Sequence, residues 1–245
     1  MPIPRFHFPA PLSGKVQVAL PDAAARHAAR VLRLRHGDRI TLFDGGGGEW
    51  QASVHAIARD SVVVDVGRHI AVEREAPLHI ALGQSLCSGD KMDTVLQKSV
   101  QLGIARFQPL ATRNSVVRLT ETRGERRHLH WQNVALHACE QCGRNRLPEV
   151  LPTDDLQAWL QAQSQGDALR LMLAPDGSRR LADLAPSGTA IVVLVGPEAG
   201  LTQAEADSAE RAGFTPVRLG PRVLRTETAG VTAIAAIQTL WGDLR

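Results

Sequence analysis

Hydrophobic residues in the first 70 positions recur with the short, alternating spacing of β-strands. Four such runs cover Lys15–Leu20, Arg39–Phe43, Trp50–Ile57 and Ser61–Val66. Only Asp22–Leu32 has helical spacing instead. Short strands separated by Gly, Asp and Pro are typical of a small β-barrel or sheet domain. We therefore expect an N-terminal β domain over residues 1–70, followed by a charged linker over residues 71–77 that ends in proline.

From residue 78 onward, strand-like and helix-like segments alternate. The expected strands are Leu78–Gly83, Arg106–Leu110, Leu169–Leu173, Ile191–Val195 and Thr215–Leu219. The expected helices are Lys91–Leu102, Thr120–Cys142, Asp155–Gln163, Thr202–Ala212 and Thr226–Gly242. This alternation predicts an α/β domain with a mainly parallel sheet over residues 78–245.

The composition excludes several classes of protein. With 245 residues, of which 44% are hydrophobic and 22% charged, the chain can form two domains that each bury a core, so disorder and fibrous repeats are excluded. No apolar run approaches the roughly 20 residues that span a bilayer. The first residues contain early prolines and lack the apolar core of a signal peptide. We expect a cytoplasmic protein.

The basic residues are mostly arginine. Of the 28 lysines and arginines, only Lys15, Lys91 and Lys98 are lysine, which leaves 25 arginines against 25 acidic residues. The planar guanidinium group suits phosphates and base edges, so this bias hints at nucleic acid. A GC-rich genome would give the same bias without any function. The positions of the arginines must therefore decide between the two interpretations.

The basic excess lies in the N-terminal domain. Residues 1–70 carry a net charge of +3, residues 71–170 of +1 and residues 171–245 of −1. Arg26, Arg30 and Arg33 are spaced i, i+4, i+7, which places them on one face if the helix extends that far. Five arginines lie between positions 26 and 39, and only Asp38 offsets them. A solvated helix face and a phosphate-binding patch both remain open.

Several familiar motifs are absent or misleading. The run Asp44–Gly48 lacks the Gly-Lys-Ser/Thr ending of a P-loop, so it predicts a hairpin turn. Cys139 and Cys142 form a CxxC pair, but only Cys87 remains, so we expect free thiols and no metal site. The chain contains no HExxH, GxSxG or GxGxxG pattern. Conventional metalloprotease, serine hydrolase and dinucleotide chemistry is therefore not expected.

Two loops in the C-terminal third carry unusual residues. The strand ending at Val195 leads into GPEAGL at 196–201, and Thr202 with Glu205 predicts a capping box for the next helix. Glycines at the carboxyl end of a strand let a ligand approach the backbone. The second loop, LGPRVLRTETA at 219–229, places two arginines, a glutamate and two threonines before an apolar helix. Such residues are costly there unless they bind something.

The residues of these two loops resemble those of the SPOUT class of RNA methyltransferases, and within it the 16S rRNA uracil-N3 methyltransferases, the RsmE family. The resemblance covers the whole chain. The N-terminal RFHF and the segment 27–50 are similar to that family's PUA-like RNA-binding domain. GDKMDTVLQKSVQLG at 89–103 and EQCGRNRLPEV at 140–150 match its middle segments. The chain departs from the family at Ala199, where glycine is usual and a methyl group could narrow the loop.

The resemblance implies a C-terminal domain with a deep trefoil knot, a homodimer, and a bent S-adenosylmethionine held by three loops. It places adenine against backbone groups near Leu219, Val223 and Leu224. The implied cofactor-binding residues are Leu173, Ala174, Pro175, Gly196, Pro197, Glu198, Gly200, Leu201, Leu219, Gly220, Val223, Leu224, Arg225, Thr228 and Ala229.

The implied target is the uridine numbered 1498 of 16S rRNA in the small subunit. Methylation at uracil N3 requires removal of the N3 proton and stabilisation of negative charge on O2 and O4. Arg225 is the first candidate for stabilising this negative charge as a fixed cation, and Arg222 is the second. Glu198 or Glu227 is the candidate base, and either needs a raised pKa to be efficient; a structural role for each stays open.

N3 lies on the Watson–Crick edge, so the uridine must be unpaired or flipped out of its helix. A separate basic domain would dock the RNA by its phosphates. The candidate RNA-binding residues of the small domain are Arg26, Arg30, Arg33 and Arg35, and those of the catalytic domain are Lys91, Arg144 and Arg146.

Two other interpretations remain. The same fold could act on another RNA, for instance on a tRNA ribose 2′-hydroxyl; the N-terminal domain and the segment GRNRLPEV favour the uracil-N3 branch. The chain could instead be a non-catalytic RNA-binding or ribosome-assembly factor. The intact RVLRTETA motif argues against this, and failure to bind S-adenosylmethionine would favour it.

Overall fold

The computed structural model describes residues 3–59, 61–88, 90–115, 120–163 and 166–244. The chain forms two compact units. The first consists of Met1–Glu75 together with Cys139–Leu147, and the second of Ala76–Ala138 together with Pro148–Arg245. The segment Cys139–Leu147 therefore belongs to the N-terminal unit. The boundaries expected from the sequence, 1–70, 71–77 and 78–245, do not group it with that unit.

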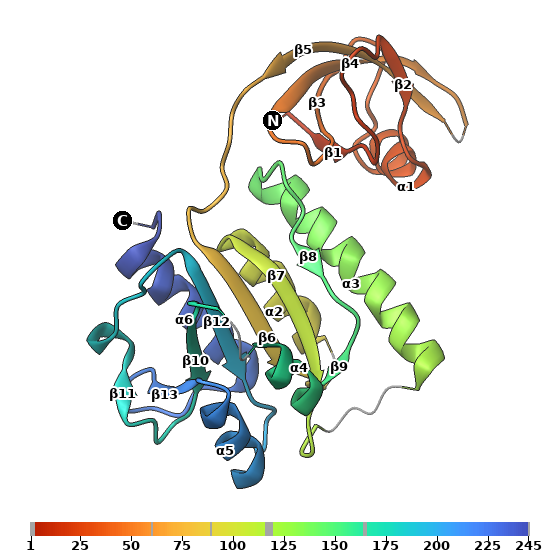
Figure 1. The fold of residues 1–245 in the computed structure, drawn as a ribbon. Helices are drawn as coiled ribbons and strands as arrows, with labels where there is room; N and C mark the ends of the chain where they lie inside the picture. The colour runs from red at the N-terminus through yellow and green to blue at the C-terminus, as the bar shows by residue number, and fades with distance from the viewer. Residues whose placement is uncertain (1–2, 60, 89, 116–119, 164–165, 245) are drawn as a thin grey trace. The chain divides into compact units, whose positions relative to one another are not determined.

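The first unit is built on a curled five-stranded sheet with the order β1-β3-β4-β5-β2 (Figure 1). The strands are β1 (Arg5–His7), β2 (Gln17–Ala19), β3 (Arg39–Phe43), β4 (Glu49–Ile57) and β5 (Val62–Ile70). β1 runs parallel to β3, and the other neighbours are antiparallel. In the described residues the edge strands β1 and β2 do not pair, so the sheet is an open half-barrel rather than a closed barrel.

Local sequence explains where this unit differs from the predicted elements. β1 has only three residues between prolines, too few for an alternating pattern to appear. The predicted helix divides into α1 (Asp22–Arg26) and a π-helical turn over His27–Val31, in which the Leu32 N–H donates to the His27 carbonyl at 3.0 Å. The wider turn ends the helix before Arg33, whose φ is 52°. Arg33 therefore does not share a helix face with Arg26 and Arg30.

The segment Cys139–Leu147 is held in the first unit by hydrogen bonds and ion pairs. The Arg5 Nη2 donates to Asn145 Oδ1 at 2.7 Å, and Asn145 Nδ2 donates to the Val72 carbonyl at 2.8 Å. Arg144 is buried, and its Nη2 lies 2.5 Å from Glu75 Oε2. By its contacts the segment belongs to the first unit, although it lies within residues 78–245 of the sequence.

The second unit contains a parallel sheet with the order β11-β13-β10-β12-β6-β7-β8, and β9 also pairs with β7. Its strands are β6 (His79–Ser85), β7 (Ile104–Ala111), β8 (Glu149–Val150), β9 (Asp154–Asp155), β10 (Leu169–Leu173), β11 (Arg179–Arg180), β12 (Ala190–Val195) and β13 (Thr215–Arg218). All of these pairings are parallel, which confirms the predicted α/β class. β8, β9 and β11 have two residues each, too short for a sequence pattern to reveal.

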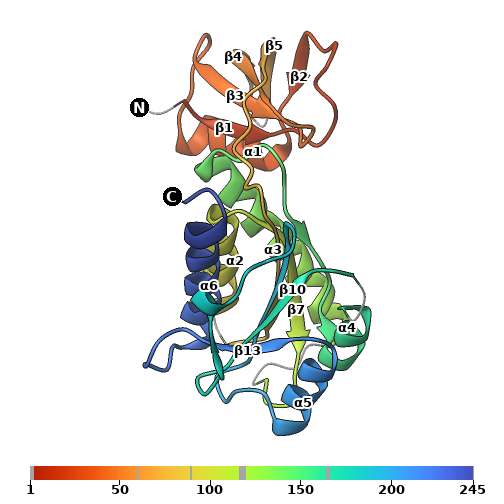
Figure 2. The same cartoon turned by 60° about the vertical axis from the view of Figure 1, so that its left-hand side comes forward.

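Helices cover both faces of this sheet. They are α2 (Lys91–Gln101), α3 (Glu121–Cys142), α4 (Leu156–Gln163), α5 (Gln203–Arg211), α6 (Thr226–Trp241) and the 3₁₀ turn Leu181–Asp183. α2 and α6 lie side by side on one face, and α4 and α5 lie on the other (Figures 1 and 2). Alternation along β6 produces this arrangement, because Leu82 and Gln84 face Gly230 of α6 while Gly83 lies under Trp159 of α4.

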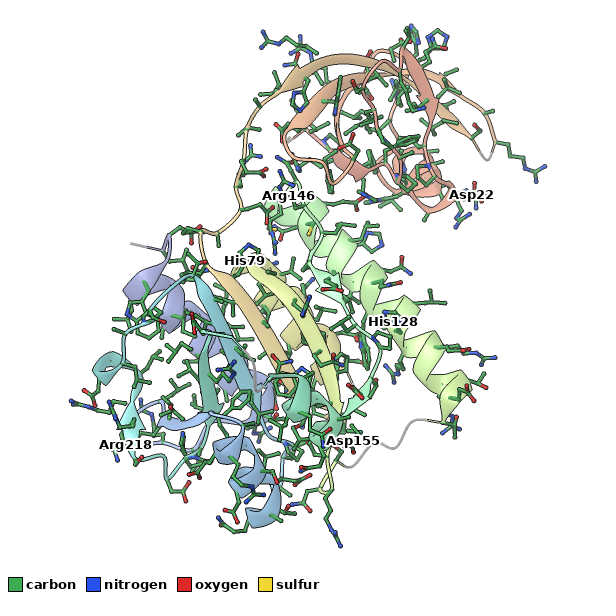
Figure 3. All side chains as sticks on the ribbon, viewed as in Figure 1. Asp22, His79, His128, Arg146, Asp155 and Arg218 are labelled. Carbon is green, nitrogen blue, oxygen red and sulfur yellow. The ribbon has the colours of Figure 1, made fainter. Side chains whose placement is uncertain are left out.

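The register of the parallel strands places three loops at one edge of the sheet. Leu173 of β10 is level with Val195 of β12 and with Val217 of β13. Figure 3 marks the two edges: His79 begins β6, while Arg218 ends β13 at the opposite edge. The connections after β10, β12 and β13 therefore start together.

Gly83→Ala should destabilise the second unit. An added Cβ would lie 2.6 Å from Trp159 Cη2 and 3.0 Å from Leu110 Cδ1, in a packed layer. Overpacking of this kind costs about 1–3 kcal/mol, so the urea midpoint monitored by tryptophan fluorescence should fall. Gly188→Ala is the matched control, because its Cβ would meet nothing within 4 Å. Equal midpoints for the two variants would contradict this packing.

Candidate active site

A cavity of about 590 Å³ lies at the edge where these loops begin. It belongs entirely to the second unit. Its lining comes from three loops, their flanking residues and α2: Met172–Asp176 after β10, Val195–Glu198 with Gly200 and Leu201 after β12, Val217, Leu219, Gly220, Arg222–Glu227 and Ala229 around the third loop, Gln203 and Ala206 of α5, and Lys91 of α2.

The cavity brings together nearly all of the cofactor residues expected from the sequence. Every one of them lines it except Thr228, which is exposed on α6. The four candidate catalytic residues, Arg222, Arg225, Glu198 and Glu227, line it as well. Ala199 is exposed and lies outside the lining, so its methyl group does not narrow the cavity.

The loop after β12 is fixed at both ends. Gly200 has φ 75°, a backbone conformation that favours glycine, and its N–H donates to the Pro197 carbonyl at 2.9 Å. Thr202 and Glu205 form the predicted capping box at the start of α5. The other carboxylate oxygen of Glu205 accepts the Arg113 N–H at 2.8 Å. The loop is therefore tied to the segment that follows β7.

A chain of buried hydrogen bonds joins the other loops. Gln84 Nε2 donates to Thr226 Oγ1 at 2.9 Å, and Thr226 Oγ1 donates to the Gly196 carbonyl at 2.6 Å. Gln84 is the next-to-last residue of β6, Gly196 follows β12, and Thr226 begins α6. The start of α6 is therefore held against the loop after β12.

A charged cluster forms one wall of the cavity. Lys91 Nζ lies 2.9 Å from Glu198 Oε1 and 3.8 Å from Glu227 Oε2. The backbone N–H and hydroxyl of Ser88 also donate to Glu198 Oε1, each at 3.2 Å. Sequence reasoning placed Lys91 among the RNA contacts and missed this pairing. The sequence did contain a signal for this pairing. Lys91 begins the helix that follows strand β6, so it lies at the same edge of the sheet as the cavity loops.

The cluster sets the protonation of its members. Burial raises the pKa of Glu198, but hydrogen bonds from Lys91 and from backbone N–H groups outweigh it and lower the pKa to about 2. Burial, with the nearby Glu198 carboxylate, raises the pKa of the Cys87 thiol to about 12. Glu198 is therefore a weak proton acceptor, and Cys87 stays a neutral thiol rather than a nucleophile.

Arg222 and Arg225 leave their guanidinium groups available at the cavity. Both side chains belong to exposed residues, and neither makes an ion pair with the residues that the structure describes. Arg225 is the N-cap residue of α6, so its backbone is fixed by the helix that it precedes. Two arginines therefore line the cavity without forming an ion pair with the described carboxylates.

The candidate RNA-binding arginines of the first unit are all exposed: Arg26, Arg30, Arg33 and Arg35. Val31 and Leu32, between them in the sequence, are 69% and 39% exposed. Arg146 pairs with Glu73 at 3.1 Å but keeps 52% of its side chain exposed, whereas the Arg144 side chain is only 7% exposed. A buried, paired Arg144 has little surface to offer a phosphate.

Within the residues described, no group of three or more His, Cys, Asp or Glu side chains gathers into a possible metal site. The three cysteines are free thiols. The same part of the chain contains no helix that is long and apolar enough to cross a membrane.

Comparison with known proteins identifies close similarities over the full length. A family model described as an RNA methyltransferase domain matches residues 74–238, and one described as an RNA methyltransferase PUA domain matches residues 20–67. The chain is 30% identical over 243 residues to ribosomal RNA small subunit methyltransferase E of Buchnera aphidicola subsp. Acyrthosiphon pisum, covering 99% of this chain and 96% of that protein.

Two solved structures are similar as well. One is a ribosomal RNA small subunit methyltransferase E from Neisseria gonorrhoeae bound to S-adenosyl methionine, with a TM-score of 0.92, 42% identity, and coverage of 99% of this chain and 100% of that chain. The other, from Legionella pneumophila, is described as a methyltransferase in complex with the cofactor SAM, with a TM-score of 0.95, 34% identity and full coverage of both chains.

Glu198→Gln should reduce the pH dependence of stability in acid. Because folding lowers the pKa of Glu198 from 4.5 to about 2, its carboxylate stabilises the folded state above pH 4.5, and this contribution is lost as the pH falls toward 2. The variant should therefore be less stable than the wild type near neutral pH, and the difference should narrow at about pH 3. Urea midpoints measure this, with the exposed Glu210→Gln as control. A difference that does not change with pH would refute the assignment.

Proposed function

The chain belongs to the ribosomal RNA small subunit methyltransferase E family of RNA methyltransferases, and on this premise we propose that it methylates N3 of a uridine in 16S rRNA. The target that we propose is the uridine numbered 1498, in the decoding region of the small subunit. One observation carries the proposal: the three loops that bear the motifs of this family close around a single cavity and place two arginines and two glutamates in it.

S-adenosylmethionine is the methyl donor, and the cavity fits it. Its volume of about 590 Å³ lies within the range of cofactor pockets, and its lining combines apolar side chains such as Leu173 and Leu201 with backbone groups near Leu219 and Leu224. One carboxylate oxygen of Glu227 is buried there without a hydrogen-bond partner among the described residues. Bound in the cavity, the cofactor supplies an electrophilic methyl group on its sulfonium.

The side chains of the cavity can stabilise the reacting uracil. As N3 loses its proton, negative charge spreads to O2 and O4. Arg225 and Arg222 line the cavity and form no ion pair with the described residues, so their cationic groups are available to stabilise the developing charge. Glu198 and Glu227 are the cavity's candidate proton acceptors. Holding uracil and methyl donor together supplies a further large part of the rate.

The first unit supplies RNA docking in this proposal. N3 takes part in Watson–Crick pairing, so the uridine has to leave its stack before it reaches the cavity. Arg26, Arg30, Arg33 and Arg35 would hold rRNA phosphates and position the strand, while the second unit reads one base. In this proposal residues 1–70 dock the RNA, residues 71–77 are the linker, and residues 78–245 carry the methylation site, apart from Cys139–Leu147, which pack in the first unit. The reaction takes place in the cytoplasm, where the small subunit is found.

We extend the proposal to a deep trefoil knot in the second unit and to a homodimer. The knot is supported by the return of the chain after β13, because Thr226 is hydrogen bonded between Gln84 of β6 and Gly196, the residue after β12. α6 then packs against β6, β12 and α2. Small-angle scattering and crosslinking would test the dimer.

Arg225→Ala should abolish methyl transfer while the protein still folds and binds S-adenosylmethionine. Small subunits, free 16S rRNA or tRNA are offered with labelled cofactor, and the product is mapped by reverse transcription, since a methyl group on N3 blocks pairing. We expect the wild type to give one stop in 16S rRNA and the variant to lose at least about 100-fold in rate, as when one stabilising donor is removed. The control is Arg218→Ala, which lies outside the cavity lining.

Transfer to tRNA by the wild type, or to a ribose hydroxyl, would overturn the choice of substrate. Failure of the wild type to bind S-adenosylmethionine in calorimetry would favour a non-catalytic RNA-binding or ribosome-assembly factor. Full activity of Arg225→Ala would remove this residue from the mechanism.

Arg30→Ala combined with Arg33→Ala should weaken RNA binding. Each phosphate contact that is lost lowers the salt dependence, so the slope of log K against log salt should become shallower by about 1–2 units. Filter binding over a salt series measures this. Arg59→Ala with Arg68→Ala removes the same charge from exposed positions of the first unit and should have a smaller effect. Equal affinities and slopes for both pairs would exclude the patch.

A further inference from the structure

The two glutamates of the cavity differ in how fully their oxygens are used. Glu198 Oε1 accepts three hydrogen bonds, from Lys91 Nζ and from the backbone and hydroxyl of Ser88. Glu227 Oε2 is buried and accepts none from the described residues, although Lys91 Nζ lies 3.8 Å away. Glu198 Oε1 is therefore fully used by the protein, whereas Glu227 Oε2 accepts no hydrogen bond from the described residues.

The three hydrogen bonds to Glu198 Oε1 have a structural consequence. Glu198 lies in the loop after β12, Lys91 begins α2, and Ser88 lies in the segment between β6 and α2. Their hydrogen bonds tie that loop to the segment after β6. A carboxylate that accepts several hydrogen bonds stays ionised and gives up little basicity to a substrate. Glu198 is suited to hold the loop rather than to move a proton.

The ammonium of Lys91 acts on Glu227 as well. At 3.8 Å it is within ion-pair distance but beyond hydrogen-bond distance, so it lies near the Glu227 carboxylate without donating a hydrogen bond to it. A carboxylate oxygen that accepts no hydrogen bond from the described residues, in the same lining as the two arginines, is suited to take the proton from uracil N3.

We propose that Lys91 divides the work of the two carboxylates: it holds Glu198 as the tie of the cofactor loop and leaves Glu227 as the acceptor of the uracil N3 proton. This assignment rests on the proposed function and deepens it. In this division Glu227 is a catalytic residue and Lys91 a positioning residue, not an RNA contact.

The step balances in atoms and electrons. The proton leaves N3 for a carboxylate oxygen of Glu227, and the N3 lone pair forms the new bond to the methyl carbon. The methyl–sulfur bond breaks, and its electron pair stays on the sulfur, which loses its positive charge. Glu227 then releases the proton to solvent. Arg222 and Arg225 offset the charge on the uracil oxygens during transfer.

The pH dependence follows from the groups that face Glu227. These are the ammonium of Lys91, the carboxylate of Glu198, the neutral thiol of Cys87, and the guanidinium groups of Arg222 and Arg225 in the same lining. Removing the ammonium takes away the cation that lies within ion-pair distance of both carboxylates, so the acid limb of the rate profile should move to higher pH.

The test compares Glu227→Gln, Glu198→Gln, Lys91→Met and Lys91→Arg in single-turnover methylation of unmethylated small subunits at saturating labelled S-adenosylmethionine. Calorimetry gives the cofactor Kd of each variant, and the wild type and lysine variants are assayed across pH. Glu210→Gln, an exposed glutamate of α5, is the control for loss of a carboxylate.

We expect Glu227→Gln to lose about 100-fold or more in rate, the size of a missing general base, with a cofactor Kd within about threefold of the wild type. Glu198→Gln should raise the Kd and lose less than about tenfold at saturation, as expected for a lost hydrogen bond. Lys91→Met should move the acid limb to higher pH, and Lys91→Arg should restore it.

Three results would overturn the assignment: a small loss for Glu227→Gln, an equally large loss for Glu198→Gln at saturation, or an unmoved acid limb in Lys91→Met. A large rise in cofactor Kd for Glu227→Gln would assign that residue to cofactor binding instead. A wild type that transfers no methyl group to small subunits would contradict the proposed function itself, so the two failures are distinguishable.

Discussion

The site depends on the parallel alignment of adjacent strands. Because β13, β10, β12 and β6 are neighbours and all run in one direction, the segments that follow them must begin at one edge of the sheet. Parallel sheets bind ligands at this edge, where backbone groups and helix starts are exposed. Three loops far apart in the sequence therefore meet around one cavity, with α2 supplying Lys91 from the segment after β6.

Two sets of interactions hold these loops in a defined arrangement. One is neutral and buried, and runs from Gln84 through Thr226 to Gly196. The other is charged and joins Lys91 to Glu198. Both cross between segments that the sheet brings together, so each is available only after the strands have paired. The arginines of the cavity remain outside these ties.

The sequence is most informative where periodicity is long or a motif is specific. The bounds of α2, α3 and β12 and the capping box of α5 match the prediction closely, and the family that the two motifs resemble implied most of the residues that line the cavity. Features that depend on tertiary contacts were not predictable. The π-helical turn that removes Arg33 from its helix face, and the ion pair that buries Arg144, leave no local signal. Lys91 was found, but its carboxylate partners are over 100 positions away.

The position of the bound cofactor tests this account most directly. A crystal structure with S-adenosylhomocysteine should show the ligand between the loops 173–176, 196–201 and 219–229, with its sulfur facing Arg225 and Glu227 and with Lys91 still paired to Glu198. Density for the ligand at any other place, or a Lys91 that turns away from Glu198 to bind the ligand, would contradict it.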